Sequence, residues 1–488
     1  MKNLFALVLG CVVLVGFIGC GGGGSSTPAP TPTPTPSQVF PNDTSTAQTA
    51  PVKLATSGGN ANDLGTKVCC IGTLGSLWTK TGVTNPVILS NNHVLDRSGN
   101  GAAGEAINQP LQLVCTPPGS PAPLTVATLT QGAALKPTVN EPGQCPGSTA
   151  PLCGHAPSNV DAAIAEIVPG QVDLSGSLLD IGAVGTTSIA PAPPSSTLGV
   201  PALNEAVSKS GRTTGLTCST IQSLNSTIQI DYDAKCGDTT PAFTALFVNQ
   251  VTINGGSFSS SGDSGSLVVD TGTARAVALL YGGNTTSTVA NPIQDVITAF
   301  GGPAAFKIVG AGDHAVSCAK TASAGSLQVG FAQSTLVPAE RERVAAVHQR
   351  RAAAMMRDFS LSSVEIGASA DNPREGALVL HVSGKSAPNV PAVVEGVRTR
   401  LVLDNANAQQ PSVTAQQISS AIAVKEAHVG DFIGHPGIQG IGVSISADNP
   451  AETAISIYVI KGAAHPAIPA TIDGVRTRVF EGERFKAY

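Results

Sequence analysis

The chain has 488 residues, enough for more than one domain, and 42% of them are hydrophobic, so it can bury sizeable cores. Only 12% are charged, whereas glycine (54) and proline (35) are abundant, which favours short strands and turns over long helices. The net charge of −5 provides no basic field that would attract nucleic acid, so nucleic acid is excluded as an expected partner.

The N-terminal residues 1–19 have the pattern of an export signal. Lys2 supplies a positive start, and the apolar run 4–18 is too short and too early for a membrane span. The run ends Phe17-Ile18-Gly19-Cys20, which resembles a bacterial lipobox and implies lipid on Cys20. The expected location is therefore the cell envelope, by a lipid anchor in the membrane; the alternative is ordinary secretion with cleavage elsewhere.

Residues 20–50 are expected to form a linker. Four glycines and two serines follow Cys20, and then a Thr-Pro repeat continues to Pro36. A Thr-Pro repeat favours extended polyproline II and acts as a semi-rigid stalk.

Residues 51–310 have the pattern of an all-β domain, with runs of four to eight apolar or β-branched residues separated by Gly, Pro, Asn and Ser. The clearest strands are expected at 67–73, 87–90, 125–129, 162–167, 227–231, 246–253, 267–270 and 276–281.

Three polar residues of this domain have the types and settings of a nucleophile, a base and an acid. Ser264 lies between Gly262 and Gly265 in Ser-Gly-Asp-Ser-Gly-Ser, a tight turn on which backbone N–H groups can face a developing oxyanion. His93 follows the apolar run 87–89, and Asp161 begins the segment 161–167. The separations are 68 (161 − 93) and 103 (264 − 161) residues. Taken singly, each is more often a turn residue or a cap; their combination indicates a triad.

The order His93, Asp161, Ser264, together with the segments 210–218, 278–283 and 289–293, resembles the bacterial chymotrypsin/trypsin-like serine proteases. The resemblance implies a mainly β fold of two six-stranded barrels with these catalytic residues in the cleft between them. It implies an oxyanion hole from the amides of Gly262 and Ser264.

The resemblance also implies a substrate-binding edge and a specificity pocket. The edge is Leu280-Tyr281-Gly282, which would pair with an extended substrate. The implied mechanism needs neither a metal nor another cofactor. Phe258 stands where a trypsin-type pocket has an aspartate, so it becomes a candidate substrate-binding residue and a preference for Lys or Arg is not expected.

Eight cysteines remain when Cys11 leaves with the signal and Cys20 carries lipid. An even number in an exported chain indicates disulfides, although the pairing is not determined by sequence. The local prediction is Cys218–Cys236, because a strand and its neighbouring hairpin lie between them.

The composition changes after the β domain, with a small, polar linker expected at 311–335 and a duplicated region at 336–488. Ser-Ala-Asp-Asn-Pro occurs at 369–373 and at 446–450, and Gly-Val-Arg-Thr-Arg at 396–400 and at 474–478. Amphipathic helices are expected at 340–356 and before the second copy, with each copy continuing as strands and a short helix. Two such copies would form a smaller α+β domain, with either a structural role or a role in substrate docking or cleft regulation.

The leading hypothesis is a tethered serine endopeptidase acting on peptides or proteins. One alternative is a catalytically inactive trypsin-like scaffold that binds a partner. Another is an esterase-like hydrolase with the same triad, which the Gly-Asp-Ser-Gly setting disfavours.

Overall fold

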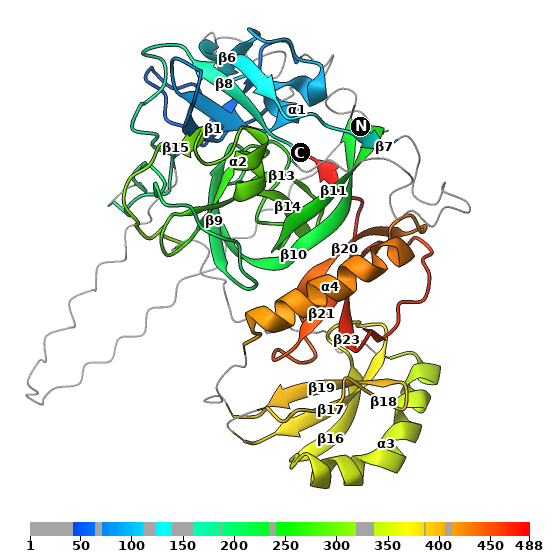
Figure 1. Ribbon diagram of the computed structural model, residues 1–488. Coiled ribbons are helices and arrows are strands. Elements are labelled where there is room, and N and C mark those ends of the chain that lie inside the picture. Colours follow the sequence, from blue (N-terminus) through cyan, green and yellow to red (C-terminus); the bar gives the residue numbers. More distant parts are fainter. Residues whose placement is uncertain are drawn as a thin grey trace, which may run out of the picture. The chain divides into compact units, whose positions relative to one another are not determined.

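The structure of the protein is a computed structural model that describes residues 42–63, 71–111, 123–138, 160–185, 188–233, 241–318, 336–384, 387–405 and 412–488 (Figure 1). The expected signal segment and Cys20 lie outside these ranges, as does most of the Thr-Pro linker. Within them, no helix combines the length and apolar character needed to cross a membrane.

The first sheet has eight strands in the order β15-β3-β4-β8-β6-β5-β1-β2. Their bounds are β1 Thr56–Asn60, β2 Gly72–Leu74, β3 Ser76–Lys80, β4 Val87–Ser90, β5 Ala106–Gln109, β6 Leu124–Gly132, β8 Ala163–Ile167 and β15 Phe306–Ile308. Trp78 is buried in its core and stacks on Phe306 with ring centroids 4.5 Å apart. A four-residue helix, α1 (Asn92–Leu95), and a 3-10 turn, Arg97–Gly99, follow β4.

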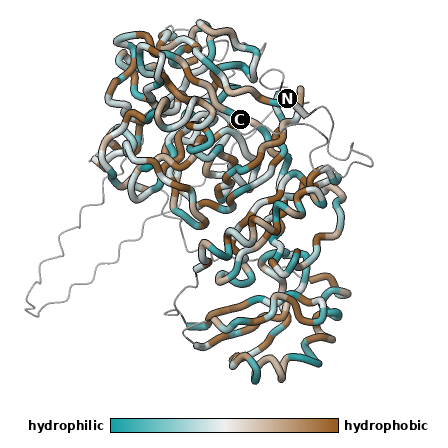
Figure 2. The backbone as a smooth tube through the Cα atoms, viewed as in Figure 1, coloured by the Kyte–Doolittle hydropathy of each residue, from teal (hydrophilic) through white to brown (hydrophobic). Residues whose placement is uncertain are grey.

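The second sheet contains a ring of six strands. Antiparallel pairings run from β10 to β9, β12, β13, β14 and β11, and β11 pairs again with β10. The bounds are β9 Ala206–Gly211, β10 Gly215–Asp233, β11 Pro241–Asn254, β12 Leu267–Asp270, β13 Ala276–Gly283 and β14 Ser287–Pro292, with the two-residue β7 (Pro137–Thr138) on β11 and helix α2 (Ile293–Ala299) after β14. Hydrophobic stretches recur along these strands and along the repeats (Figure 2).

The predicted mainly β character is confirmed, and most predicted strands are present. Residues 87–90 and 267–270 are β4 and β12 with the predicted bounds. The predictions at 227–231 and 246–253 identify only parts of β10 and β11, which form one long hairpin. The strand predicted at 67–73 begins outside the described residues, and the first sheet has two strands more than the six expected.

The predicted disulfide Cys218–Cys236 is wrong, because Cys218 bonds to Cys318, 100 residues later, with a Cα–Cα distance of 6.1 Å. The chain after β15 returns along the second sheet, where the amide of Val316 donates to the carbonyl of Thr271 at 2.8 Å. The beginning of the expected linker therefore packs on the β domain and supplies the partner of Cys218. Cys236 lies outside the described residues.

The two repeat copies have the same strand pairing. The first contains α3 (Pro338–Asp358), β16 (Ser363–Ala368), β17 (Gly376–Val382), β18 (Val393–Val394) and β19 (Val397–Leu403), and the second contains α4 (Ala415–Phe432), β20 (Ile438–Ile445), β21 (Thr453–Ile460), β22 (Thr471–Ile472) and β23 (Val475–Gly482). In each copy the first two strands are antiparallel, and the second pairs in parallel with the last. The expected short helices are wrong: the two-residue strands β18 and β22 stand in their place.

The second copy extends the second sheet, whereas the strands of the first copy form a sheet of their own. Strand β20 pairs with β10 through Ser223↔Ser444 and its neighbours. The buried ammonium of Lys425 on α4 donates to the hydroxyl of Thr227 on β10 at 2.8 Å. A polar contact and a continuous sheet therefore join the second copy to the β domain.

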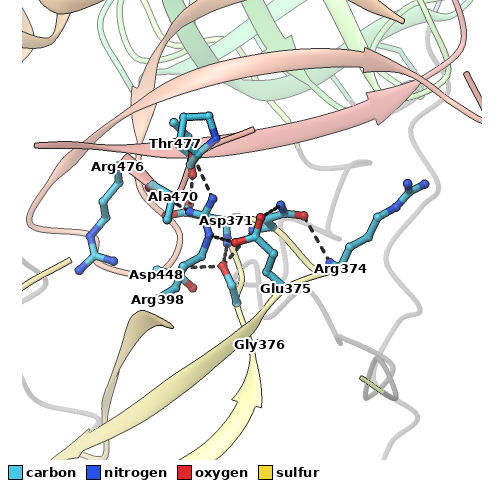
Figure 3. Close-up of polar contacts among 12 residues, drawn as sticks. Asp371, Arg374, Glu375, Gly376, Arg398, Asp448, Ala470, Arg476 and Thr477 are labelled. Atoms are coloured by element: carbon cyan, nitrogen blue, oxygen red, sulfur yellow. Dashed lines mark hydrogen bonds and ion pairs between the residues drawn. The ribbon is translucent and has the colours of Figure 1, made fainter. Parts of the chain in front are cut away.

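An aspartate of each copy accepts hydrogen bonds from the other copy across a buried contact (Figure 3). Asp448 accepts from the hydroxyl of Ser369 and the amide of Ala370, both at 2.6 Å. Asp371 accepts in the same way from the hydroxyl of Ser446 at 2.5 Å and the amide of Ala447 at 2.6 Å. The Asp-Asn-Pro turn of each copy is thus completed by the other copy.

Two buried arginines, one in each copy, also donate hydrogen bonds to the opposite copy. Arg398 donates to the carbonyl of Thr477 at 2.8 Å, and Arg476 donates to the carbonyl of Thr399 at 2.8 Å. Each guanidinium also donates through Nε to a glutamate of its own copy: Arg398 to Glu375 at 2.7 Å (Figure 3), and Arg476 to Glu452 at 2.6 Å. A buried guanidinium needs such partners because an unpaired buried charge is strongly destabilising.

Burial and the nearby Asp371 raise the pKa of Asp448 to about 6. The folded state therefore holds a proton that the unfolded state releases, and this group's contribution to stability falls as the pH rises from about 4 to about 6. We expect Asp448→Asn, which cannot ionise, to gain stability relative to the parent between pH 4 and pH 7. Urea unfolding at both pH values measures this difference, and the exposed Asp358→Asn provides the control. A parent–variant difference independent of pH would contradict the prediction.

Candidate active site

The register between β4 and β8 brings His93 to Asp161. Ser90, the last residue of β4, is paired with Ala163, the first residue of β8. His93 lies just after β4 on α1, and Asp161 lies just before β8. Nδ1 of His93 is 2.6 Å from Oδ2 of Asp161.

The Asp161 carboxylate is fully buried and receives four hydrogen bonds. Its Oδ1 accepts from the amides of Asn92 at 2.7 Å and His93 at 3.2 Å. Its Oδ2 accepts from the His93 ring and from the hydroxyl of Tyr232 at 2.7 Å. Four donors stabilise the ionised form of a carboxylate that has no access to water.

Two residues of the second sheet hold Asp161. Tyr232, on β10, donates to the side chain, and Asn291, on β14, accepts from the Asp161 amide at 3.0 Å and donates to the Asp161 carbonyl at 3.1 Å. Asn291 lies in the segment 289–293 that supported the family resemblance, but it was given no role there. Tyr232 carried no signal in the sequence, because its contact spans 71 residues.

The His93 ring faces an acceptor at each nitrogen. Nδ1 faces the Asp161 carboxylate, and Nε2 is 3.0 Å from the main-chain oxygen of Tyr488. Since a carbonyl oxygen and a carboxylate can only accept, both ring nitrogens must donate, which is the imidazolium form. Burial lowers the pKa of His93, but the charge and hydrogen bond of Asp161 and the hydrogen bond to Tyr488 outweigh burial and raise it.

Ser264 lies on a turn that glycines make possible. Gly262 and Gly265 have φ of +98° and +94°, a region that L side chains rarely adopt. The Ser264 hydroxyl donates to the carbonyl of Tyr281 at 3.1 Å, so it is directed to β13 rather than to His93. On the other side of the turn, the amide of Thr73 donates to the Ser264 carbonyl at 2.7 Å.

The amides of Gly262 and Ser264 donate no hydrogen bond to any residue that the structure describes. Their neighbours are bonded: the amide of Asp263 donates to Ser260, and that of Gly265 to Leu280. The two unbonded N–H groups belong to the residues expected to form the oxyanion hole.

A buried ion pair between Lys209 and Asp263 stabilises the turn that carries Ser264. The Asp263 carboxylate accepts from the amides of Thr213 at 2.8 Å and Ser260 at 2.9 Å, and Nζ of Lys209 lies 3.5 Å from it. Burial lowers the pKa of Lys209 to about 8, although the charge of Asp263 opposes this shift. The sequence contains Lys209 one residue before the segment 210–218, but nothing there indicated a partner for Asp263.

The residues expected to bind substrate have buried side chains, and two of them contact the C-terminal residues through their main chain. The side chains of Leu280 and Tyr281 are buried, and the Leu280 main chain is bonded to Gly265 and Ser266. Gly282 pairs through its main chain with the C-terminal strand β24 (Lys486–Ala487), and the carbonyl of Tyr281 accepts from the amide of Tyr488. Phe258 is buried, in the hydrophobic cluster against which Tyr488 packs.

The chain matches no protein family model and no curated protein sequence. Among solved structures it is similar to a glutamic acid specific serine protease, at 14% identity over 53% of this chain and 100% of that one, with a TM-score of 0.32. It is also similar to Thermobifida fusca protease A, at 15% identity over 53% of this chain and 98% of that one, with a TM-score of 0.30. Nocardiopsis protease is similar at 14% identity over 49% and 92%, with a TM-score of 0.30. These neighbours are bacterial chymotrypsin-like serine proteases.

The charge of Asp161 predicts how the His93 ring titrates. We expect Asp161→Asn to lower the pKa of His93, because the variant removes the negative charge that offsets burial. Tyr232→Phe keeps that charge and is the matched control, for which no such fall is expected. An NMR titration of the full chain with 13C-labelled histidine measures both variants. An unchanged His93 pKa in Asp161→Asn would refute the electrostatic explanation.

Proposed function

We propose that this protein is a serine endopeptidase that hydrolyses peptide bonds of peptides or proteins and is tethered to the cell envelope. The observation that supports it best is the buried His93–Asp161 pair, at 2.6 Å, together with Ser264 on a turn that has two unbonded amides. Among the residues that the structure describes these two N–H groups have no acceptor, so they are available to a developing oxyanion.

The proposed reaction uses only groups of the chain and water. The Ser264 hydroxyl leaves the Tyr281 carbonyl and attacks the substrate carbonyl, while neutral His93 takes its proton at Nε2. The amides of Gly262 and Ser264 stabilise the oxyanion, each by about 3 kcal/mol. Protonated His93 then gives the proton to the leaving amine, and water hydrolyses the acyl-enzyme by the same steps.

Asp161 keeps the base in its working form. By accepting from Nδ1 it leaves Nε2 free to take a proton, and it stabilises the imidazolium that results. Tyr232 and Asn291 are positioning residues: both hold Asp161 by hydrogen bonds, and the Tyr232 ring also lies edge-on to the His93 imidazole, with ring centroids 6.0 Å apart.

We infer a chymotrypsin-type double barrel for the β domain, with the site between its two halves. The six-strand ring of the second sheet supports this inference, and His93 and Ser264 come from the two different sheets. The proposed division keeps 51–310 as the protease domain, extended by 311–318 through the Cys218–Cys318 bond, with the repeats at 336–488.

Labelling with a fluorophosphonate probe separates an endopeptidase from an inactive scaffold. We expect the full chain to be labelled over hours and Ser264→Ala not at all. Asp161→Asn should be labelled more slowly by on the order of 10⁴-fold, because it favours the wrong tautomer of the base. If the parent and a chain that ends after Phe485 both stay unlabelled at pH 8, a live nucleophile is refuted.

A peptide-library digest then separates a peptidase from an esterase. Hydrolysis of simple esters without cleavage of any peptide would favour the esterase-like alternative. The Ser264→Ala chain is the control for a contaminating protease.

The proposed lipid anchor is tested by metabolic labelling with an alkyne fatty acid in a bacterial host. We expect label on the parent and none on Cys20→Ser, since the thiol is the expected site of attachment. Cys318→Ser controls for the loss of a cysteine elsewhere. Equal labelling of the parent and Cys20→Ser would exclude this anchor.

A further inference from the structure

The C-terminal residues of the chain lie on the candidate active site. Strand β24 pairs antiparallel with the end of β13, through Gly282↔Ala487 and Gly283↔Lys486 (Figure 1). The amide of Tyr488 continues this pairing by donating to the carbonyl of Tyr281 at 3.3 Å. The three residues 486–488 therefore add a strand to an edge, as an extended peptide does.

Two glycines of β13 make room for this strand. A Cβ on Gly282 would lie 2.4 Å from the carbonyl oxygen of Lys486, and a Cβ on Gly283 would lie 2.3 Å from the hydroxyl of Tyr488. Neither glycine has a positive φ, so the backbone conformation does not require glycine at either position. At Gly282 the close approach of the added chain requires glycine, whereas at Gly283 the carbonyl oxygen of Ser287, 2.7 Å from such a Cβ, also leaves no room for a side chain.

The main-chain oxygen of Tyr488 is hydrogen-bonded to His93, the proposed catalytic base. It is 3.0 Å from Nε2 of His93, the nitrogen that must be free to accept the proton of Ser264. At the same time, Ser264 donates to Tyr281, the residue whose carbonyl accepts from Tyr488. The position of Tyr488 corresponds to that of the residue whose carbonyl is attacked.

The Tyr488 side chain is partly buried and packs against hydrophobic residues that include Val277, Ala278 and Leu280 of β13. It packs against the cluster that contains Phe258, and its hydroxyl is 3.4 Å from the carbonyl oxygen of Asn284. Burial raises the pKa of Tyr488 to about 12, so the phenol is held neutral. These surroundings offer apolar packing for the ring and a carbonyl acceptor for the hydroxyl, which fits a tyrosine side chain.

A buried anchor brings these residues to the groove. Phe485 is fully buried among aromatic rings of the second sheet and the second repeat, which include Tyr232, Tyr281 and Tyr458. Its carbonyl accepts from the amide of Asp231 at 3.0 Å, and its amide donates to the side chain of Gln439 at 2.9 Å. The second repeat, through β23 and this anchor, delivers the last three residues to the site.

We infer that the active site binds peptide chains with tyrosine immediately before the scissile bond, and that residues 486–488 occupy it in this way and keep the enzyme inhibited. The inference rests on the proposed function for its catalytic part. Occupancy holds His93 as the imidazolium, which cannot act as a base.

The test compares the full chain with one that ends after Phe485 and so retains the anchor. We expect fluorophosphonate labelling of Ser264 to be roughly tenfold faster, or more, without residues 486–488, because the site is then open most of the time. Tyr488→Asp should also be faster, whereas Lys461→Ala, at an exposed lysine outside residues 486–488, should keep the parental rate. Equal rates for the full and shortened chains would overturn the inference. Tyr488→Asp keeps the test valid if the shortened chain fails to fold.

The pH profile distinguishes occupancy of the site from a general structural effect. The groups that act on His93 are Asp161, Asp63 and the Tyr488 oxygen, with Tyr232 facing it through Asp161. Since the Tyr488 hydrogen bond raises the pKa of His93, its removal lowers that pKa. We therefore expect the acid limb of labelling to lie at lower pH in the shortened chain. An unmoved acid limb would contradict occupancy of the base.

A binding measurement separates failure of the inference from failure of the proposed function. A fluorescent peptide ending Arg-Phe-Lys-Ala-Tyr is added to the shortened chain that also carries Ser264→Ala, and anisotropy is recorded. We expect binding of this peptide and none of the same peptide ending in Asp; equal binding, or none, overturns the inference. If no chain is labelled but the Tyr peptide binds selectively, the endopeptidase proposal fails and the peptide site stands.

Discussion

One buried carboxylate joins the two sheets at the site. Asp161 accepts from His93, which follows the first sheet, and from Tyr232, which belongs to the second. Its main chain is held by Asn291 of the second sheet as well. An ionised carboxylate without water is tolerated only with such a set of donors, so the position of the base depends on the contact between the sheets. Any change that separates the sheets would therefore disable the imidazole, and it would also break the hydrogen bond from Thr73 of the first sheet to the Ser264 carbonyl.

The sequence predicted local features well and distant partners poorly. The motif of Ser264, strands β4 and β12, and the repeat were readable, because each is a short pattern with its own turn chemistry. The partners Tyr232 of Asp161 and Lys209 of Asp263 depend on how long strands cross, and no local pattern reports that. The disulfide prediction failed for the same reason, since nearness in sequence was taken for nearness in space.

The second copy of the repeat contacts both the second sheet and the residues that lead to the candidate active site. This copy is continuous with the second sheet through β20, and its last strand leads to Phe485 and then to the groove beside His93. The sequence left open a structural role or a role at the cleft. The contacts make these roles compatible, because the same strands that extend the sheet hold the C-terminal residues in position. The buried Lys425 on α4 fixes this arrangement by a polar contact that a shift of one residue would break.

The reciprocal hydrogen bonds between the copies are consistent with an origin of the region by duplication. Asp371, Arg398 and their counterparts Asp448 and Arg476 each satisfy groups on the opposite copy, in a reciprocal pattern. One copy alone leaves charged groups exposed that an identical copy would satisfy, which is the condition for a two-fold symmetric homodimer. Fusing two such subunits into one chain would preserve every one of these contacts, while freeing one end of the pair to diverge into a segment that reaches the neighbouring β domain.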